Sequence, residues 1–266
     1  MKVVAINCSP RRDKGLCYAF LSRVLLGAEE GGAETSVLHV IDDKPSYCIH
    51  CNHRCFKTHE CPIEPAAAQR SQLLDDCDGV VIAVPVYVWQ PSGLAAAFLD
   101  KLRLAAGAWN KSMPNGRPAL GIAVAGGSGT GVFSSLQLLY ASLCHWKFRP
   151  LQPLPVTRYN LDKAFHLAEQ LGRQLAKTPT QPFEEIGDVL LEYDAIPFLR
   201  FTRRDEFRWL AHQIREGFVL HNQSRLLAEM DHLLAEAERC RRNSDEKGES
   251  RAVFKAYEIG YQAWKH

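Results

Sequence analysis

The sequence predicts an α/β fold, in which a doubly wound parallel sheet of five strands is followed by a helical extension. Two observations predict it. Over residues 1–177, apolar runs of strand length alternate with segments of helical periodicity, as repeated βα units around a parallel sheet require. Beyond residue 177, two prolines in five residues break the alternation, and the remaining pattern is helical.

The five predicted strands are continuous runs of small and branched apolar residues. Parallel strands that are buried on both faces have this composition, because neither side of the strand meets water. The clearest case is the unbroken run of valine, isoleucine and alanine in the third strand. The predicted strands are Val3 to Asn7, Thr35 to Val40, Gly79 to Val84, Ala119 to Ala125 and Leu151 to Val156.

Five predicted helices follow these strands. Gly31 and Gly32 form a stop signal for the first helix, and Ser92 after Pro91 is a start signal for the third. The order of elements is that of a doubly wound sheet. The predicted helices are Leu16 to Glu30, Pro65 to Cys77, Ser92 to Ala106, Val132 to Lys147 and Leu161 to Lys177.

The extension covers residues 178–266 and begins with a linker, Thr178 to Pro182, in which prolines exclude a regular helix. A helical pattern runs from about Arg203 to Arg242, and Val253 to Trp264 predicts a short final helix. We expect the charged stretch from Arg241 to Arg251 to be exposed or mobile.

Composition excludes several classes of function. A formal net charge of +2 gives no reason to expect a nucleic-acid partner, and no apolar run approaches the roughly 18 residues of a membrane span. The N-terminus reads as a first strand rather than a signal peptide, so we expect a cytoplasmic protein. Nine cysteines without a secretion signal favour reduced thiols or metal ligands over disulfides.

The loop between the first strand and the first helix has the composition of a phosphate site. A helix N-terminus there directs backbone N–H groups at one point. Hydroxyl and thiol groups could donate hydrogen bonds, and two basic side chains could supply charge. Taken alone, a polar loop without a ligand explains this segment equally well. The candidate residues are Ser9, Arg11, Lys14, Gly15, Leu16 and Cys17.

Two further loops follow the third and fourth strands. The first, stiffened by proline, could present aromatic side chains and backbone groups to an isoalloxazine ring, although these side chains could instead cover the core. The second is rich in glycine, which permits either close approach to a ligand or a tight turn. All three loops lie at the carboxyl edge of one sheet, where open α/β folds bind ligands. The added candidates are Pro85, Val86, Tyr87, Val88, Trp89, Gly126, Gly127 and Gly131.

These motifs carry a family resemblance. The chain contains Ser9-Pro10-Arg11 followed by Gly15, then Pro85-Val86-Tyr87 leading into residues 93–102, and then Gly126-Gly127. These motifs resemble those of the NADPH-dependent FMN reductase family of flavodoxin-like proteins, including its iron-sulfur flavoprotein branch. The resemblance implies that residues 1–177 form a flavodoxin-like domain that binds FMN noncovalently. By the same resemblance, the first loop holds the phosphate, the second contacts the flavin ring and the third flanks it.

The chain departs from that family at four positions. Asn7 stands where the family often has glycine. Leu16 and Cys17 stand where the family usually has asparagine followed by serine or threonine. Trp89 is larger than the residue often found at its position, and it is placed to cover or restrict the flavin face.

Four cysteines lie in fourteen residues between the second strand and the next helix, in the pattern C-x2-C-x3-C-x5-C. The resembling iron-sulfur flavoproteins hold a cluster at this place, so a [4Fe-4S] centre is one interpretation. Zinc with added histidine ligands is a second, and free thiols or a redox disulfide a third. The candidate metal ligands are Cys48, Cys51, Cys55 and Cys61, with His50, His53 or His59 added for zinc.

Three functions remain open. The leading one is an FMN-dependent NAD(P)H oxidoreductase acting on a small acceptor such as a quinone or a flavin; because FMN carries the chemistry, no catalytic side chain is named. The second is an iron-sulfur flavoprotein that passes electrons between the cluster, FMN and a ferredoxin-like partner. The third is a non-enzymatic flavin or redox sensor.

The extension has two interpretations. It packs on the domain or joins a subunit interface, since family members are commonly dimers or tetramers and we expect a homodimer or homotetramer. Alternatively, its aromatic side chains cover the flavin of a neighbouring subunit. Those side chains are Trp209, Phe218, Tyr261 and Trp264.

Overall fold

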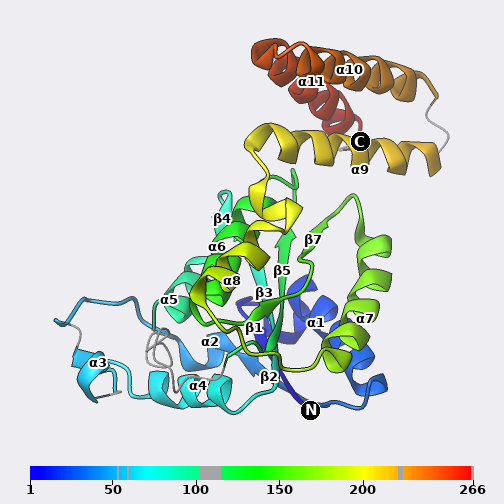
Figure 1. Cartoon of the computed structure of the whole chain (residues 1–266). Helices are drawn as coiled ribbons and strands as arrows, with labels where there is room; N and C mark the ends of the chain where they lie inside the picture. The colour runs from blue at the N-terminus through cyan, green and yellow to red at the C-terminus, as the bar shows by residue number, and fades with distance from the viewer. Residues whose placement is uncertain (53, 59, 102–114, 221–223, 265–266) are drawn as a thin grey trace.

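The computed structural model describes residues 1–52, 54–58, 60–101, 115–220 and 224–264. They form an α/β unit with further helices at one end of its sheet (Figure 1). Within these residues, no helix is both long enough and apolar enough to cross a membrane.

The sheet has the strand order of a flavodoxin-like fold. Its parallel strands run β2-β1-β3-β5-β7, β6 pairs with the start of β5, and β4 turns back antiparallel on β3. The fifth predicted strand, Leu151 to Val156, is observed as β7, which begins only at Leu154, because Pro153 has no N–H for the ladder; β6 lies just before the predicted range. The strands are β1 Lys2–Asn7, β2 Glu34–His39, β3 Gly79–Tyr87, β4 Gln90–Pro91, β5 Pro118–Ala125, β6 Arg149–Pro150 and β7 Leu154–Thr157.

Helices cover both faces of the sheet, and alternate strand residues supply the two cores. Val3, Ala5 and Val81 pack under α1 and α7, whereas Val4 and Ile82 pack under helices of the other face. The predicted doubly wound α/β fold is thereby confirmed. The helices of this unit are α1 Leu16–Glu30, α2 Val40–Asp43, α3 Arg54–Thr58, α4 Ala66–Asp75, α5 Gly93–Lys101, α6 Val132–His145 and α7 Leu161–Lys177, with the 3-10 turn η1 at Arg12–Lys14.

The helix predicted over Ser92 to Ala106 is described only as far as Lys101, and the rest of that prediction lies outside the described residues. Residues 183–201 contain a helix that the sequence analysis did not predict, α8 Ile186–Asp194, followed by the turn η3 Pro197–Arg200. Phe183, Val189 and Tyr193 of this segment are buried in the same core as α6. The first part of the extension therefore packs directly on the sheet unit.

The rest of the extension forms three helices, which we call the C-terminal helices: α9 Arg203–Leu220, α10 Ser224–Arg242 and α11 Glu246–Trp264. They lie beyond the carboxyl ends of β5 and β7 (Figure 1). Leu210, Ile214 and Met230 form a core of their own. The pattern predicted from about Arg203 to Arg242 is thus two helices, with residues 221–223 outside the described residues.

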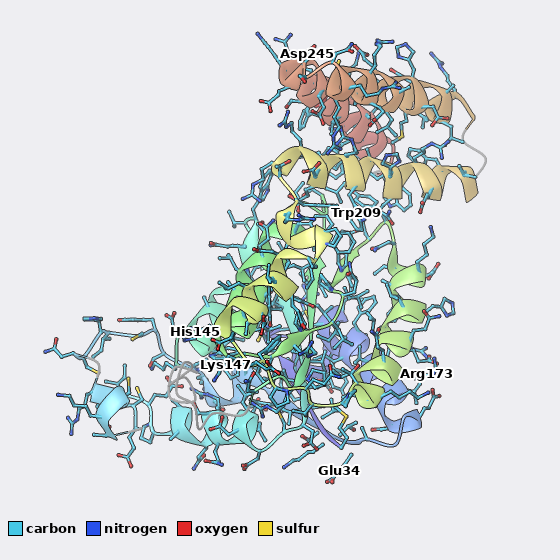
Figure 2. All side chains as sticks on the ribbon, viewed as in Figure 1. Glu34, His145, Lys147, Arg173, Trp209 and Asp245 are labelled. Carbon is cyan, nitrogen blue, oxygen red and sulfur yellow. The ribbon has the colours of Figure 1, made fainter. Side chains whose placement is uncertain are left out.

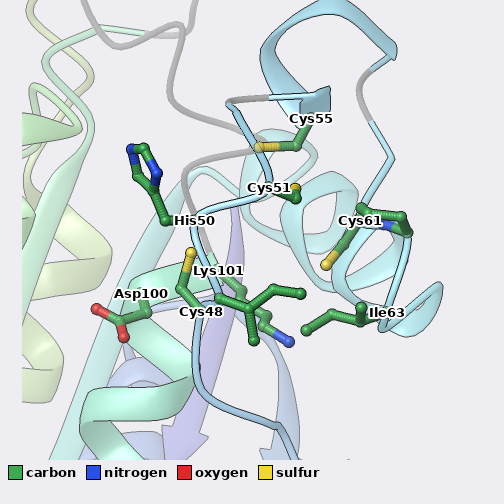
Figure 3. Close-up of a pocket in the computed structure, with 10 residues that line it drawn as sticks. Cys48, His50, Cys51, Cys55, Cys61, Ile63, Asp100 and Lys101 are labelled. Atoms are coloured by element: carbon green, nitrogen blue, oxygen red, sulfur yellow. The ribbon is translucent and has the colours of Figure 1, made fainter.

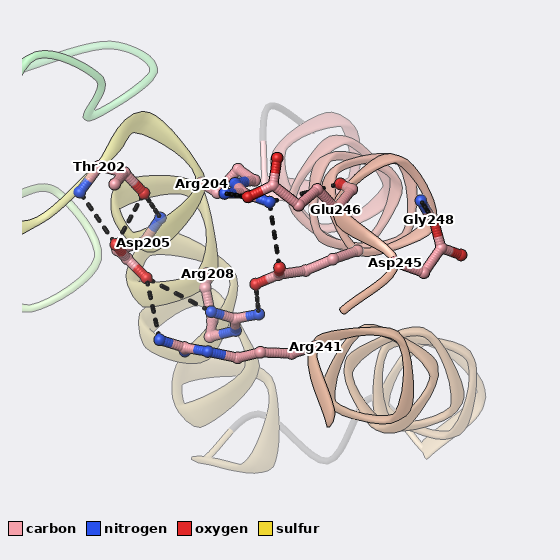
Figure 4. Close-up of polar contacts among 9 residues, drawn as sticks. Thr202, Arg204, Asp205, Arg208, Arg241, Asp245, Glu246 and Gly248 are labelled. Atoms are coloured by element: carbon pink, nitrogen blue, oxygen red, sulfur yellow. Dashed lines mark hydrogen bonds and ion pairs between the residues drawn. The ribbon is translucent and has the colours of Figure 1, made fainter. Parts of the chain in front are cut away.

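The charged stretch joins α10 to α11. Residues 241–247 are exposed, as expected, but the chain is helical from Glu246 onward and Glu249 is buried. Arg204 and Arg208 of α9 both pair with Glu249 (Figure 4). This part of the stretch is therefore a polar junction between α9 and α11.

Candidate functional site

The first candidate loop is held by its own polar side chains. The Asn7 side chain accepts the Ser9 N–H at 3.0 Å and donates to the Arg12 carbonyl at 3.0 Å. The Ser9 hydroxyl, which is buried, accepts the Arg11 N–H at 3.2 Å. A Cβ at Gly15 would lie 3.1 Å from the Ser9 Oγ, so the loop closes tightly around this hydroxyl.

The side chains of this loop point in different directions. Arg11, Lys14 and Leu16 are exposed at the start of α1. Cys17 is buried in the core under α1, and burial raises the pKa of its thiol to about 12. Cys17 can therefore offer a ligand its backbone N–H in the first turn, whereas its thiol faces the core.

The second candidate loop is a tight hairpin. Val86 and Tyr87 pair with β4, and the two turn residues, Val88 and Trp89, have φ values of +51° and +66°. Positive φ at both central residues is the type I′ turn, which normally requires glycine or asparagine. A branched residue such as Val88 is strained there, and its side chain is nevertheless 90% exposed. Strain of this kind is typical of functional loops.

The third candidate loop contacts the hairpin through glycine. At Gly131, φ is +86° and a Cβ would lie 2.3 Å from the Trp89 Cα, so only glycine allows the two loops to meet. The Ser134 hydroxyl also donates to the Trp89 carbonyl at 2.6 Å. A Cβ at Gly126 or Gly127 would contact nothing within 4 Å, so this half of the loop faces open space.

The C-terminal helices and Tyr159 hold the same loop from its other side. The Tyr257 hydroxyl of α11 donates to the Ser128 carbonyl at 3.0 Å, and the Tyr159 hydroxyl lies 3.4 Å from that oxygen. Phe207 of α9 lies against the Trp89 ring, with centroids 5.9 Å apart. The carboxyl edge is therefore braced by a segment far away in the sequence.

A buried carboxylate caps α6. Glu206 of α9 is 1% exposed, and its Oε1 accepts the Phe133 N–H in the first turn of α6 at 3.0 Å. Burial raises the pKa of this carboxyl, and the N–H groups at the start of α6 oppose the rise. Trp209, one turn further along α9, contacts the Phe133 ring edge-on with centroids 5.1 Å apart. Figure 2 shows Trp209 where α9 meets the sheet unit.

The three helices that follow the candidate loops differ at their N-termini. Glu206 caps α6, and the Ser92 hydroxyl accepts the Ala95 N–H at the start of α5. Among the described side chains, none caps α1, whose N-cap residue is Gly15. Unpaired N–H groups and the positive end of the helix dipole attract an anion. Of these three helices, α1 is therefore the one whose first N–H groups donate no bond to a described side chain and could meet an anion.

The aromatic side chains of the extension lie against their own chain. Trp264 contacts the Tyr159 ring edge-on at 5.2 Å between centroids, and Phe218 lies 5.7 Å from Trp264. Tyr261 stacks on Tyr257 with centroids 5.6 Å apart. These contacts match the interpretation in which the extension packs on its own domain.

The four clustered cysteines line one pocket. Cys48, Cys51, Cys55 and Cys61 surround a common space, together with Asp100 and Lys101 at the end of α5 (Figure 3). Burial raises the pKa of Cys55, and so does the proximity of the other three thiols. None of the nine cysteines, all of which lie in the described ranges, forms a disulfide.

The pocket supplies the donors of a four-thiolate centre without yet holding them in a ligating arrangement. In the described ranges, no three His, Cys, Asp or Glu side chains are grouped closely enough to bind a metal ion. His50 lines the pocket, whereas His53 and His59, the other proposed zinc ligands, lie outside the described residues. The donor type fits an iron-sulfur cluster or zinc, and the choice between them stays a prediction.

A network of buried charges lies beside this pocket. Lys101 and Arg70 both pair with Glu64, and Arg70 also pairs with Asp43 at 3.3 Å. Burial alone would raise the pKa of Glu64, but hydrogen bonds from Lys101, Arg70 and the Ser46 backbone lower it to about 2. Glu64 is therefore ionised at neutral pH.

A family model described as NADPH-dependent FMN reductase matches residues 1–152. The chain belongs to this family.

Curated relatives of the family are iron-sulfur flavoproteins. One from Archaeoglobus fulgidus is 35% identical over 124 residues, which cover 47% of this chain and 62% of the relative. One from Methanocaldococcus jannaschii is 31% identical over 140 residues, which cover 53% of this chain and 69% of the relative. The match thus spans less than two thirds of the length of the first relative.

Solved structures share the fold of this reductase-family chain. The crystal structure of an FMN-dependent NADH-azoreductase from Bacillus anthracis in complex with FMN has a TM-score of 0.52 and 15% sequence identity. The similarity covers 66% of this chain and 99% of that one. At this identity, the likeness concerns the fold alone.

The structure brings the predicted loops of this family member to one edge of the sheet and adds residues that sequence reasoning missed. The hairpin and the glycine loop are in contact, and the first loop lies beside β3, with the Cys8 N–H bonded to the Ala83 carbonyl at 3.0 Å. No local pattern marks the added residues as site residues, because each acts on a partner distant in the sequence. They are Tyr159, Glu206, Phe207 and Tyr257 at the carboxyl edge, and Ser46, Glu64, Arg70 and Lys101 at the cysteine pocket.

Proposed function

We propose that the chain binds FMN noncovalently at the carboxyl edge and is an NAD(P)H-dependent oxidoreductase that reduces a small acceptor such as a quinone or a flavin. The observation that carries the proposal is the N-terminus of α1, which no described side chain caps, next to a loop with three exposed cations, of which Arg12 pairs with Asp42. Family membership supports the same assignment.

The residues of the edge fit the parts of FMN. Ser9, Arg11 and Lys14, with the first N–H groups of α1, suit a phosphate. The hairpin residues Tyr87 and Trp89 are partly exposed aromatic groups that suit a flat ring. The open space beside Gly126 and Gly127 leaves room for a ring to approach the backbone.

Bound FMN would supply hydride and electron transfer, and the chain would bind and orient it. The hairpin tip, fixed by Gly131 and Ser134, would set the position of the ring. Phe207 and Tyr257 would hold the two loops in place and keep water from their contacts.

A comparison of FMN with riboflavin tests the phosphate assignment, because riboflavin lacks the phosphate. We expect Arg11→Ala and Lys14→Ala to weaken FMN binding about five- to tenfold each, since an exposed charge-assisted contact contributes roughly 1 kcal/mol. Riboflavin binding should not change. Arg12→Ala is the matched control, because this guanidinium already pairs with Asp42 at 3.0 Å. Equal losses for both flavins would contradict the assignment.

Anaerobic mixing of the FMN-loaded protein with NADPH or NADH tests the activity. Bleaching of the flavin absorbance, followed by its return on addition of a quinone, is the expected result. Tight FMN binding without reduction by either nucleotide would overturn the reductase proposal and favour a redox sensor.

A second function, an iron-sulfur flavoprotein, is favoured by one specific observation: four cysteines of a 14-residue segment line a single pocket. In this proposal, Cys48, Cys51, Cys55 and Cys61 bind a [4Fe-4S] cluster that exchanges electrons with FMN and with a ferredoxin-like partner. The names of the curated relatives support it.

Metal analysis of protein purified without oxygen distinguishes the interpretations of the pocket. About four irons and four sulfides per chain, lost on Cys55→Ala, would support the cluster. One zinc per chain would indicate a zinc site instead of the cluster. If the protein contains neither iron nor zinc, the four cysteines are free thiols. The Cys77→Ala variant is the control, because that thiol is buried in the core away from the pocket.

A further inference from the structure

Lys101 is a buried cation in the wall of the cysteine pocket. Lys101 is the last residue of α5, and only 5% of its surface is exposed. It lines the same pocket as the four clustered cysteines (Figure 3). Burial of an ammonium group is costly unless it is paired, so this position requires partners.

Its partners are the two ends of the cysteine segment. The Lys101 Nζ donates to the Ser46 Oγ before the first cysteine and to the Glu64 Oε2 after the last. Glu64 also accepts the Ser46 N–H at 2.9 Å and the Ser46 hydroxyl at 3.0 Å. Lys101 therefore fixes both ends of the segment at one point, next to the thiols that the segment carries.

Lys101 is the buried charged residue that lines the pocket, whereas its partner Glu64 is not among the lining residues. Two cations, Lys101 and Arg70, share the buried carboxylate Glu64, whereas the side chain of Asp43, the other partner of Arg70, is 31% exposed. Asp100, the acidic residue lining the pocket, is exposed as well. Because water screens exposed charges far better than buried ones, Lys101 acts on the interior of the pocket more strongly than the exposed Asp100 does.

We propose that Lys101 raises the reduction potential of a thiolate-bound cluster in this pocket. The proposal rests on the second function above. A cluster bound by four thiolates is anionic, and one-electron reduction adds a further negative charge. A fixed neighbouring cation stabilises the reduced form more than the oxidised form, so it raises the potential. Lys101 is thus a positioning and tuning residue rather than a cluster ligand.

A charge cycle separates this role from a purely structural one. The proteins are the natural chain, Lys101→Met, Glu64→Gln and the double variant, all loaded with FMN and reconstituted anaerobically with iron and sulfide. The cluster is titrated with dithionite and followed by its visible absorbance. Iron content, FMN content and circular dichroism are measured on each protein.

The expected shifts follow the sign of the charge that is removed. Lys101→Met should lower the potential, by roughly a tenfold change in the ratio of oxidised to reduced cluster, or about 59 mV for a one-electron couple. Glu64→Gln should raise it, and the double variant should return close to the natural value. Lys101→Arg keeps the charge and should keep the potential. Lys57→Met removes an exposed lysine from the same segment and is the matched control for a screened charge.

The outcomes are distinct. Equal potentials in all cluster-containing variants would overturn the proposal while leaving the cluster itself intact. Loss of iron from every variant of Lys101 and Glu64, including Lys101→Arg, with FMN retained, would show that the network only fixes the loop. A natural chain that takes up no iron would overturn both the iron-sulfur function and this inference, and its flavin absorbance would still report on the proposed FMN site.

Discussion

The carboxyl edge of the sheet and the cysteine pocket are built in opposite ways. At the edge, much of the proposed FMN site is backbone: the N-terminus of α1, a strained hairpin and a glycine loop. In the pocket, they are side chains on a segment with little regular structure, whose ends meet at a buried lysine. The strands position the first site, whereas ion pairs between distant elements position the second.

The difference extends to the forces that hold each region. At the edge, Tyr257 and Phe207 hold the loops by a neutral hydrogen bond and aromatic packing, and one buried carboxylate, Glu206, caps α6. The pocket depends on buried charges whose desolvation must be balanced by pairing. The edge should therefore respond most to changes of shape, and the pocket to changes of charge and pH.

The largest expected effect is that of Gly131→Ala. The new Cβ would lie 2.3 Å from the Trp89 Cα at a φ of +86°, so overpacking and an unfavourable backbone conformation add to about 4 kcal/mol. Urea unfolding measures the loss. Gly126→Ala is the control, because a Cβ there meets nothing within 4 Å. If both variants unfolded at the same urea concentration, the close contact between Gly131 and Trp89 would not contribute to stability at the carboxyl edge.

The next effect is that of Glu64→Gln, with a loss of about 3 kcal/mol at pH 7, because the folded pKa of about 2 lies well below the ordinary value of 4.5. A lowered folded pKa stabilises the protein above the unfolded pKa, and this contribution disappears as the pH falls from about 4.5 toward 2. Urea unfolding between pH 7 and pH 3 should show the two proteins converge.

The exposed Glu60, in the same segment, provides the control for that experiment. Glu60→Gln should cost little at any pH, since a solvated carboxylate gains little from its surroundings. If the loss of unfolding free energy in Glu64→Gln did not depend on pH, the charge of Glu64 would not be what stabilises the pocket.

A smaller effect is expected for Tyr257→Phe, which removes the hydrogen bond to the Ser128 carbonyl at 3.0 Å. The loss of free energy should be about 1 kcal/mol, with a weaker affinity for FMN if the loop shifts. Tyr159→Phe should have less effect, because that hydroxyl is 3.4 Å from the same oxygen. Isothermal titration compares the affinities of the two variants for FMN. A larger loss of affinity for Tyr159→Phe would show that Tyr159, and not Tyr257, holds the glycine loop.

The smallest effect concerns Glu206→Gln. Burial raises the folded pKa of Glu206, so the natural protein loses stability as the pH rises from the unfolded value through the folded one. The amide has no such titration and can still accept the Phe133 N–H, so the variant should show a flatter dependence of stability on pH above 4.5. Parallel slopes would show that Glu206 is not the titrating group.

The elements that local pattern determines were predicted well. Helices α1 and α7 begin and end at the predicted residues, because apolar spacing, Gly31 and the linker prolines all lie in the local sequence. Helix α8 was missed, since the preceding prolines and charges favour a linker and its burial depends on the distant core residue Phe148, whose carbonyl accepts the Tyr193 hydroxyl at 2.9 Å.

The candidate loops were found because each follows a buried strand, and parallel strands bring their carboxyl ends together. Their supports could not be found in this way. Glu206 lies 73 positions from the N–H that it caps, and Lys101 lies 55 positions from Ser46. A charged residue at helical spacing reads as a solvated face, and only the tertiary fold shows that these two are buried.

The bond between Tyr257 and Ser128 joins residues 129 positions apart, and it bears on synthesis. A chain emerging from the ribosome forms its strands and their loops first, because domains fold from the N-terminus as they are made. The contacts that hold the glycine loop come from α9 and α11, which are translated after it. The edge is therefore finished late, and a nascent chain carries the loops for some time before the parts that immobilise them exist.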